Sequence, residues 1–552
     1  MKPYKIIFPF FAAFMLIACN KVGLPGENGD IPSGGQLPGG ISGSTYSFST
    51  IKYDDALADD NDDELADKSD TDIYWEAEAE SDGTFKNTIT IAYDGDDAVV
   101  TMNKKAAEVF KAEKSGAHVV ILPSGDDVKK CEIILSGSSD DGSLKIYCAT
   151  DPDDKETGKK VKLTLNGLSL KSKCGPAINY QAGKRMYLHL ADGTDNCLED
   201  SSTYSDDFFY FDGKTAADED RKGCFFSEKA VIVSGKGRLY VQGNYRHGIS
   251  VDNDFYMRPG PTVVVTGAAK NCLHCNDEIR FTGGYFYANN TSAGGKGVKT
   301  DSTLIVDGGR LVVNTSGAYD AEETSPKGFK IDGDITVNGG SITIRCTGKC
   351  EGSEGFESKS QITINGGTLD IMAYDDAMNA ATLITVNDGE VSCLSTNNDG
   401  IDSNGSIIIN GGSVTSFAAN MEAALDNDNP GSNDLFEING GNVIGIGGTA
   451  YSPSSSSKQC SIVYNGCPVS TTEEMTIKDA EGNTLLSCTS YLGSQNAGVI
   501  LSSPEFKNGS SYTLNFGTTT YNTIKLTGKV TTIGTSNGMG GGGGFGPGGP
   551  GR

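Results

Sequence analysis

Apolar and polar residues alternate in short runs through the middle of the chain. Residues 328–344 read GFKIDGDITVNGGSITI, and every second residue is apolar within each of the segments GFKID, DITVN and SITI. Alternation with a period of two predicts short strands whose apolar side chains point into a core, while Thr, Lys and Asp point outward. The pattern therefore predicts three short strands in each repeat.

A glycine turn marks each repeat. Its second glycine recurs at spacings of 22 to 31 residues, at Gly284, Gly309, Gly340, Gly367, Gly389, Gly412 and Gly441. Glycine and the asparagine that often precedes it tolerate the positive φ of a sharp turn. Hairpins use such turns too, but three strands in a fixed order within about 23 residues fit one coil of a parallel β-helix better.

The extent of the repeat sets the predicted domain boundaries. We predict an all-β chain in which a parallel β-helix, with three short strands per coil, spans residues 88–450. Beyond it the repeat stops, and strands and turns of different spacing predict a small β unit at 451–533. Residues 534–552 are too rich in glycine to bury a core and are predicted to be a tail.

The N-terminus carries a targeting pattern. It reads MKPYKIIFPFFAAFMLIACN, with two lysines, an apolar run too short for a membrane span, and a small residue followed by Cys19. This resembles a bacterial lipoprotein signal, which implies removal of residues 1–18 and lipidation of Cys19. A lipid anchor holds a protein at the membrane without crossing it. We therefore expect a lipid-anchored protein of the bacterial cell envelope, at the outer membrane or cell surface.

Two further segments precede the repeat. Residues 19–45 contain mostly Gly, Pro and Ser and are predicted to be a flexible tether, and residues 46–87 are predicted to be an acidic, solvated segment. The whole chain has a net charge of −27, which becomes −29 once Lys2 and Lys5 are removed with the signal. Such a surface repels nucleic acid, so no nucleic-acid partner is expected. Divalent cations can still bridge it to an acidic polysaccharide.

Cysteines are numerous for a chain that we place outside the cytosol, where disulfides persist. Thirteen remain besides Cys19, an odd number that cannot all pair. Candidate bridges join Cys131 with Cys148, Cys460 with Cys467, and Cys174 with Cys197, although buried free thiols fit the last two positions equally well.

Stacked strands bring equivalent residues into outward columns, which the glycine before each first strand lets us write down. The second position after that glycine gives Ser250, His274, Lys299, Lys330, Glu357, Asn379, Asp402 and Asp426. The fourth position gives Asp252, Asn276, Asp301, Asp332, Lys359, Ala381, Asn404 and Asp428. Much of each column is charged, so this face is expected to meet a polar ligand.

Oxygen ligands concentrate toward the end of the repeat. Carboxylates that converge from adjacent strands are typical calcium ligands, and the candidate set is Asp375, Asp376, Asp399, Asp402, Asp426 and Asp428. The alternative is that Asp and Asn serve tight turns here.

Lys299 and Lys330 lie one repeat apart, each two residues before an aspartate. Beside calcium, a lysine can abstract the proton α to a uronate carboxylate, which is the first step of a lyase. The same side chain can instead hold a uronate by charge, or balance its acidic neighbours.

Two smaller patterns concern aromatic and sulfur side chains. Tyr240, Tyr285 and Tyr287 fall at outward strand positions where a ring can stack on a sugar. The segment NCLHCNDE is superficially similar to a zinc motif, but neighbouring positions on a strand face opposite sides, so its Cys and His residues are interpreted as structural.

Several segments together carry a family resemblance: LNGLSLKSKCGPAIN, LADGTDNCLEDSS, GRLYVQGNYRHGISVDND and KGFKIDGDITVNGGSITI. Across residues 75–450 the chain resembles the bacterial carbohydrate-binding family of right-handed parallel β-helices, which is similar to family 9 polysaccharide lyases. The resemblance implies a right-handed coil, calcium as cofactor and a cellulose or polygalacturonate ligand. In the related lyases aspartates bind calcium and a lysine acts as the base. The nearest matches are Asp301, Asp332, Lys299 and Lys330.

Three functions follow, in order of preference. The first is a lipid-anchored, calcium-dependent protein that binds a uronate-containing or cellulose-like polysaccharide along one face. The second is a pectate-lyase-like enzyme on the same face, although Ser250, His274 and Glu357 depart from a catalytic pattern. The third is an envelope adhesin or structural protein without glycan specificity.

Overall fold

The computed structural model describes residues 49–50, 85–125, 128–149, 158–205, 219–322, 324–419, 421–427, 434–491 and 493–534. The predicted signal, Cys19, the tether, most of the acidic segment, Asp428 and nearly all of the tail lie outside the described residues. Within them the structure is almost entirely β, and the one α-helix is α2 (Lys104–Val109). None of the helical structure described is long and apolar enough to cross a bilayer.

Sheet A has fourteen strands and carries the first predicted polar column, whereas the described members of the second column lie one residue beyond the ends of its strands. In order it contains β1 (Ser49–Thr50), β4 (Phe110–Ser115), β5 (Ala117–Pro123), β7 (Gly142–Tyr147), β9 (Ile178–Ala182), β12 (Gly223–Ser227), β15 (His247–Val251), β18 (Asn271–Cys275), β21 (Lys296–Thr300), β24 (Lys327–Ile331), β27 (Phe356–Ser358), β30 (Met378–Ala380), β33 (Ile401–Ser403) and β36 (Leu425–Asp426). Every pairing from β5 to β36 is parallel.

A second parallel series, called ladder B, follows the strands of sheet A in the chain. It contains β10 (Met186–Leu190), β13 (Val231–Gly235), β16 (Phe255–Met257), β19 (Ile279–Phe281), β22 (Leu304–Val306), β25 (Ile335–Val337), β28 (Gln361–Ile364), β31 (Leu383–Val386), β34 (Ser406–Ile409) and β37 (Phe436–Ile438).

The third parallel series is ladder C. It contains β11 (Asp195–Glu199), β14 (Arg238–Gly243), β17 (Thr262–Ala268), β20 (Tyr285–Asn290), β23 (Arg310–Thr315), β26 (Ser341–Cys346), β29 (Thr368–Ala373), β32 (Glu390–Ser395), β35 (Ser413–Phe417) and β38 (Asn442–Gly447). The long strand β8 (Val161–Lys171) pairs with β10 through its first half and with β11 through its second.

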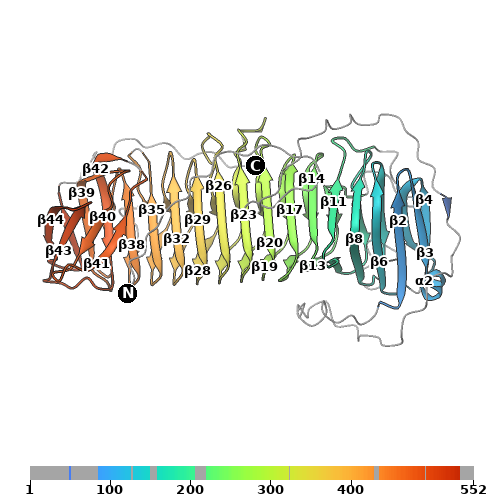
Figure 1. Cartoon of the computed structure of the whole chain (residues 1–552), viewed down its shortest axis with the longest axis horizontal. Coiled ribbons are helices and arrows are strands. Elements are labelled where there is room, and N and C mark those ends of the chain that lie inside the picture. The colour runs from blue at the N-terminus through green and yellow to red at the C-terminus, as the bar shows by residue number, and fades with distance from the viewer. Residues whose placement is uncertain are drawn as a thin grey trace.

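One repeat therefore consists of one strand from each series, in the order A, B, C. The prediction of a nearly all-β chain with long parallel sheets is confirmed. Figure 1 shows the strands standing side by side along the long axis of the molecule, from blue at the N-terminal end to red at the C-terminal end.

Glycines before the sheet A strands are explained by the core. A Cβ on Gly328 would lie 2.5 Å from Cγ2 of Ile344, and one on Gly355 would lie 2.5 Å from Cγ2 of Ile371. Both isoleucines are fully buried in the main apolar cluster, between the three series. At Gly328 and Gly355 any side chain would therefore displace the core or the neighbouring repeat.

The glycine turns between ladders B and C also form as predicted. Gly340 and Gly367 have φ of 85° and 90°, which side chains rarely tolerate. The asparagines before them form a hydrogen-bonded row across repeats: Asn365 donates to Asn338 (2.9 Å), Asn387 to Asn365 (2.8 Å), Asn410 to Asn387 (2.9 Å) and Asn439 to Asn410 (3.1 Å). The Asn-Gly turn thus binds successive repeats together as well as reversing the chain.

Antiparallel strands lie at both ends of the parallel ladders. At the N-terminal end, β3 (Asp97–Met102) pairs antiparallel with β2 (Asn87–Asp94), while β2 continues through β6 (Cys131–Ser139) to β8 in parallel. In sheet A, β4 is antiparallel to both β1 and β5. At the C-terminal end, β42 (Ser494–Ser502) pairs antiparallel with β38 and with β39 (Ser461–Val469), which in turn pairs with β45 (Val530–Ile533).

A four-stranded antiparallel sheet completes the C-terminal part. Its order is β41 (Thr484–Cys488), β40 (Met475–Lys478), β43 (Ser511–Phe516) and β44 (Thr519–Lys525). These strands and β39 share a second apolar cluster that includes Ile462, Ile477 and Leu514, separate from the core of the repeats.

The cysteines correct one set of expectations. All thirteen that are described are free thiols, so the three candidate disulfides are not formed in this structure. For Cys174 and Cys197 the register gives the reason, because the cross-strand neighbour of Cys197 is Ser169, whereas Cys174 lies in the loop after β8. A spacing of one repeat does not make two positions equivalent when one of them lies in a loop.

Candidate functional site

The outward face of sheet A carries the predicted column in the predicted register. Consecutive members are direct cross-strand partners through eight strands: Ser250, His274, Lys299, Lys330, Glu357, Asn379, Asp402 and Asp426. The face is divided along its length. Lysines occupy β21 and β24, carboxylates occupy β27, β33 and β36, and Asn379 lies between them on β30.

The cationic part consists of Lys299 and Lys330, which both contact aspartates. Lys299 forms an ion pair with Asp301 and lies 4.0 Å from Asp332, and Lys330 Nζ lies 3.6 Å from Asp332. These contacts place Asp301 and Asp332, predicted as metal ligands, as partners of the lysines. They match the interpretation in which the two lysines balance acidic neighbours.

Lys296 is a functional candidate that the sequence analysis missed. Its ammonium group donates to the carbonyl of Gly294 (2.6 Å). Burial, together with the charge of Lys330, lowers the pKa of Lys296 to about 8. Lys296 therefore loses its proton more easily than an ordinary exposed lysine.

A buried acidic cluster lies where β27 and β30 begin. Oxygens of Glu354, Asp375 and Asp376 all lie within 4.8 Å of one another. The three side chains are 8%, 6% and 4% exposed, which is unusual for carboxylates that are not neutralised. The backbone N–H of Gly352 donates to Asp375.

Hydrogen bonds extend this cluster along the face. The backbone N–H of Asp399 donates to Oδ1 of Asp376 (3.1 Å), and Oδ1 of Asp399 accepts from the backbone N–H of Ala423 (2.6 Å). Asn379 Nδ2 donates to Asp376 (2.9 Å) and to Asp402 (3.2 Å). Asp402 is the cross-strand partner of Asp426. The structure therefore brings the predicted acidic residues together, with Glu354 added and Asp428 outside the described residues.

The carboxylates of the cluster have too few positive charges nearby to balance their own negative charges. Burial, together with the charge of Asp375, raises the pKa of Asp376 to about 7. Burial, together with nearby carboxylates, also raises the pKa of Asp399 to about 7. Burial raises the pKa of Glu354 to about 8, although Lys327 opposes the change. A divalent cation would relieve this crowding, and an all-oxygen donor set is what calcium prefers. The residues present therefore fit calcium.

An ion-pair network separates the two parts of the face. Lys327 Nζ lies 2.9 Å from Glu354 and 3.1 Å from Glu357, and Lys359 also pairs with Glu357. Burial alone would raise the pKa of Glu357, but the two lysines lower it overall. Glu357 is therefore a charged structural partner of lysine, and Asp375, Asp376 and Asp399 are the side chains best placed to hold a cation.

A second column explains why Glu354 was missed. Glu354, Asp376 and Asp399 each stand immediately before the glycine or alanine of the corner, and Lys327 holds the same place one repeat earlier. Backbone bonds link these places directly, from Gly328 to Glu354 (3.0 Å), from Gly355 to Asp376 (3.0 Å) and from Ala377 to Asp399 (3.2 Å). The signal was present in the sequence, but only positions after the glycine were counted.

The three tyrosines differ in their exposure. Tyr240 is only 3% exposed, so the expectation of a surface ring is wrong for this residue. Its cross-strand neighbours are Cys197 and Val264, and apolar neighbours leave little room for a sugar. Tyr285 remains half-buried with the guanidinium of Arg310 5.3 Å from its ring, and the Tyr287 hydroxyl accepts from Asn314 (3.2 Å). These two lie on ladder C, on a different series from the charged column.

The zinc-like segment makes contacts with the backbone and with a neighbouring ring. The Cys272 thiol donates to the carbonyl of Asn289 (3.5 Å) and the Cys275 thiol to that of Asn253 (2.6 Å). The ring of His274 stacks on that of His247, with centroids 4.5 Å apart. Within the described part of the chain these residues form no shared metal cluster.

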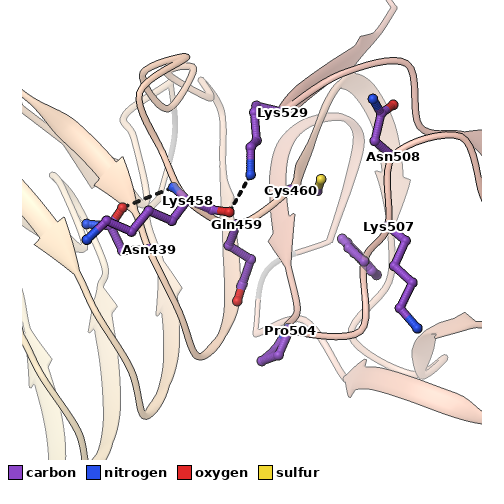
Figure 2. Close-up of a pocket in the computed structure, with 9 residues that line it drawn as sticks. Asn439, Lys458, Gln459, Cys460, Pro504, Lys507, Asn508 and Lys529 are labelled. Atoms are coloured by element: carbon purple, nitrogen blue, oxygen red, sulfur yellow. Dashed lines mark hydrogen bonds between the residues drawn. The ribbon is translucent and has the colours of Figure 1, made fainter.

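A hollow of about 460 Å³ lies apart from sheet A, between the last repeat and the C-terminal strands. Asn439, Lys458, Gln459, Cys460, Pro504, Phe506, Lys507, Asn508 and Lys529 line it. Figure 2 shows the ammonium groups of Lys458 and Lys507 extending in opposite directions, while Lys529 donates to the carbonyl of Lys458. These lysines do not converge on one anion, so sheet A remains the better candidate.

Comparison with known proteins gives the family. Residues 115–398, more than half of the chain, match the family described as "Carbohydrate-binding domain-containing protein". The chain belongs to this family, and the match includes most of sheet A. A protein of Acetivibrio thermocellus with the same description is 25% identical over 132 residues, which are 24% of this chain and 41% of the relative. The chain thus spans about two fifths of the length of that relative.

One solved structure is similar to part of the chain. It is described as a gadolinium derivative of "the polysaccharide lyase-like protein from C. thermocellum". The TM-score is 0.31 at 18% identity, and the alignment covers 59% of this chain and 93% of that one.

Proposed function

We propose that this protein binds a polysaccharide along the outward face of sheet A. The observation that carries the proposal is the family match, which extends over strands β5 to β30 of that sheet and includes Lys299, Lys330, Glu354, Asp375 and Asp376. A row of charged side chains at the spacing of the strands can contact successive sugars of an extended chain. A uronate-containing glycan suits the lysines, and a cellulose-like glycan is the alternative ligand.

The proposal includes a fold that displays the face. We infer that one strand each from sheet A, ladder B and ladder C forms one coil of a right-handed parallel β-helix. The fixed A, B, C order and the single core between the series support this inference. In such a coil the outward column of sheet A is a straight and rigid row.

Calcium is the proposed cofactor. Asp375, Asp376 and Asp399 would hold it, with Glu354, Asp402 and Asp426 close by. When bound, calcium would neutralise the crowded carboxylates and supply a positive site for oxygens of an acidic glycan. Asn379 would orient the carboxylates around the ion, because it donates hydrogen bonds to both Asp376 and Asp402.

We further propose attachment to the bacterial cell envelope through a lipid on Cys19. The signal pattern of residues 1–18 supports this location. A tether of residues 19–45 would leave the sheet A face free to meet a glycan beside the membrane. Labelling cells with radioactive palmitate should mark the wild type and leave Cys19→Ala unlabelled, whereas equal labelling of both would refute the anchor.

Affinity gel electrophoresis tests the binding proposal. Protein is run through gels that contain polygalacturonate or cellulose derivative, with calcium or with a chelator, and the same mixtures are read in the ultraviolet. Retardation that the chelator abolishes, without ultraviolet product, supports a calcium-dependent binding protein. Unsaturated product that is lost in Lys299→Ala or Lys330→Ala would instead identify a lyase. If neither retardation nor unsaturated product is seen, the result favours an adhesin or structural protein.

A further inference from the structure

A cluster of soft ligands lies at the N-terminal end of sheet A, far in the fold from the acidic part of the face. It consists of His118 on β5, Asp141 immediately before β7, and Cys174 in the loop after β8. One ligand atom from each residue lies within 4.8 Å of those of the other two. His118 and Cys174 are 4% and 1% exposed, and the side chain of Asp141 is 24% exposed.

The contacts show how the three side chains meet. His118 Nε2 lies 3.5 Å from Oδ1 of Asp141, and Sγ of Cys174 lies beside the ring, 4.0 Å from each of its two nitrogens. Zinc bonds of roughly 2.0 to 2.3 Å in a tetrahedral arrangement place ligand atoms about 3.5 Å apart. The thiol therefore has to move from beside the ring toward Nε2 for the three ligand atoms to enclose an ion.

The other ring nitrogen of His118 has the partner that a metal-bound histidine requires. Nδ1 lies 3.1 Å from Oγ of Ser143, its cross-strand neighbour on β7. A proton on Nδ1 that is donated to this hydroxyl leaves the lone pair of Nε2 free on the side of Asp141. Histidines that bind metals are commonly held in this way.

The carboxylate of Asp141 is held in place from the backbone. The N–H of Lys173 donates to its Oδ1 (3.1 Å). Partial exposure of this one side chain gives an ion a route from solvent.

We propose that His118, Asp141 and Cys174 form a binding site for a borderline transition-metal ion, Zn²⁺ in the first instance. Thiolate and imidazole ligands favour zinc over calcium. Binding exchanges the thiol proton of Cys174 for the metal and releases that proton to solvent. The ion joins three successive segments, β5, the turn before β7 and the loop before β9, at the end of the parallel ladder.

Metal titration of the whole protein tests this site. The chain is stripped with a chelator under a thiol reductant and titrated with Zn²⁺, and Co²⁺ is then used as a spectroscopic probe. We expect one ion per chain at this site, a thiolate-to-cobalt charge-transfer band, and a melting temperature that rises with zinc concentration. Cys174→Ser should abolish the band, and His118→Gln should weaken binding at least 100-fold.

Two variants and two controls keep the test decisive. Ser143→Ala should weaken zinc binding by roughly 10- to 100-fold through loss of the supporting hydrogen bond. Asp141→Asn changes a partly exposed residue, so this variant still tests the site if the variants at buried positions do not fold. His189→Gln removes a similar histidine, whose Nδ1 lies 3.2 Å from Oγ of Ser234, and Cys224→Ser removes another buried thiol.

Both controls should bind zinc as the wild type does. The proposal is wrong if the wild type shows no cobalt band, or if the band and affinity persist in Cys174→Ser and Asp141→Asn. Glycan binding plays no part in these readouts, so the outcome is independent of the proposed function.

Discussion

The backbone N–H of Asp399 donates a hydrogen bond to Oδ1 of Asp376, 3.1 Å away in the preceding repeat. The two carboxylates are 8% and 4% exposed, and each has a pKa raised to about 7. Asp376 and Asp399 hold the same position in consecutive repeats, so stacking places their carboxylates one strand apart. In a single repeat such an aspartate would belong to an ordinary turn, but together the two form a buried acidic site.

Calcium affinity should depend on these two side chains. Asp376→Asn and Asp399→Asn are each expected to weaken calcium binding by roughly tenfold or more, because affinity follows the charge of the ligands. Isothermal titration calorimetry measures the change. Glu390→Gln, an exposed acid on ladder C, is the matched control and should bind calcium normally. Equal affinity in all three variants would place calcium elsewhere.

Stability without calcium should fall as the pH rises toward 7. The folded state binds protons on Asp376 and Asp399 up to about pH 7, whereas unfolded aspartates lose them near pH 4. Between these values the folded state holds more protons, so this cluster destabilises the fold progressively as the pH rises. Thermal unfolding in chelator should therefore show a decline from pH 5 to pH 7.5 that is smaller in Asp376→Asn.

Adding calcium should reverse that pH trend in the wild type. The ion competes with protons for the same oxygens and stabilises the folded state by mass action. A melting temperature that shows the same pH dependence with and without saturating calcium would contradict the assignment of these carboxylates.

The lysines of sheet A should contribute to glycan retention. We expect Lys299→Ala combined with Lys330→Ala to weaken polygalacturonate binding roughly tenfold, which is the effect of losing a charge-assisted hydrogen bond. Lys458→Ala, at the C-terminal hollow, is the control and should behave as the wild type. Unchanged retardation of the double variant would move the glycan to another face.

The asparagine row predicts a modest and additive effect on stability. Asn387→Ala removes the bonds to Asn365 and from Asn410, both exposed, and should lower the free energy of unfolding by about 1 kcal/mol. Asn404→Ala, an exposed asparagine outside the row, should change it by less than about 0.5 kcal/mol. Chemical denaturation compares the two, and equal losses would mean that the row adds nothing.

The corner glycines should resist even the smallest substitution. Gly328→Ala places a methyl group against Ile344 and the carbonyl of Gly355, so we expect a loss of about 1 to 3 kcal/mol. Gly125→Ala is the control, since nothing lies within 4 Å of its added carbon. Similar unfolding free energies for both variants would show that the corner has room.

The periodic part of the structure could be predicted from sequence because two local signals fix it. Alternation assigns each side chain to a face, and the glycine marks where each strand begins. The predicted column from Ser250 to Asp426 therefore matches the register of the structure. Glu354 and Lys296 were missed although the same frame contains them, because the position before the glycine was not followed.

Other features depend on packing that alternation does not encode. Tyr240 lies on the predicted side of its strand, but its neighbours Cys197 and Val264 cover that side with apolar groups. The meeting of His118, Asp141 and Cys174 arises from a strand, a turn and a loop whose spacing follows no repeat. Sites of this second kind need three-dimensional coordinates.

The antiparallel strands at the ends of the ladders have a consequence for how copies of the protein behave. A row of parallel strands has no built-in length, because its last strand offers free backbone groups to any further strand, including one from another molecule. Here β3 and β4 at one end and β42 at the other take up those groups, while β36 ends sheet A with two residues and an outward aspartate. Because the parallel series is interrupted at both ends, a further copy of the chain meets no regular parallel edge to extend, which opposes growth into fibres and gives a repeating architecture a defined size.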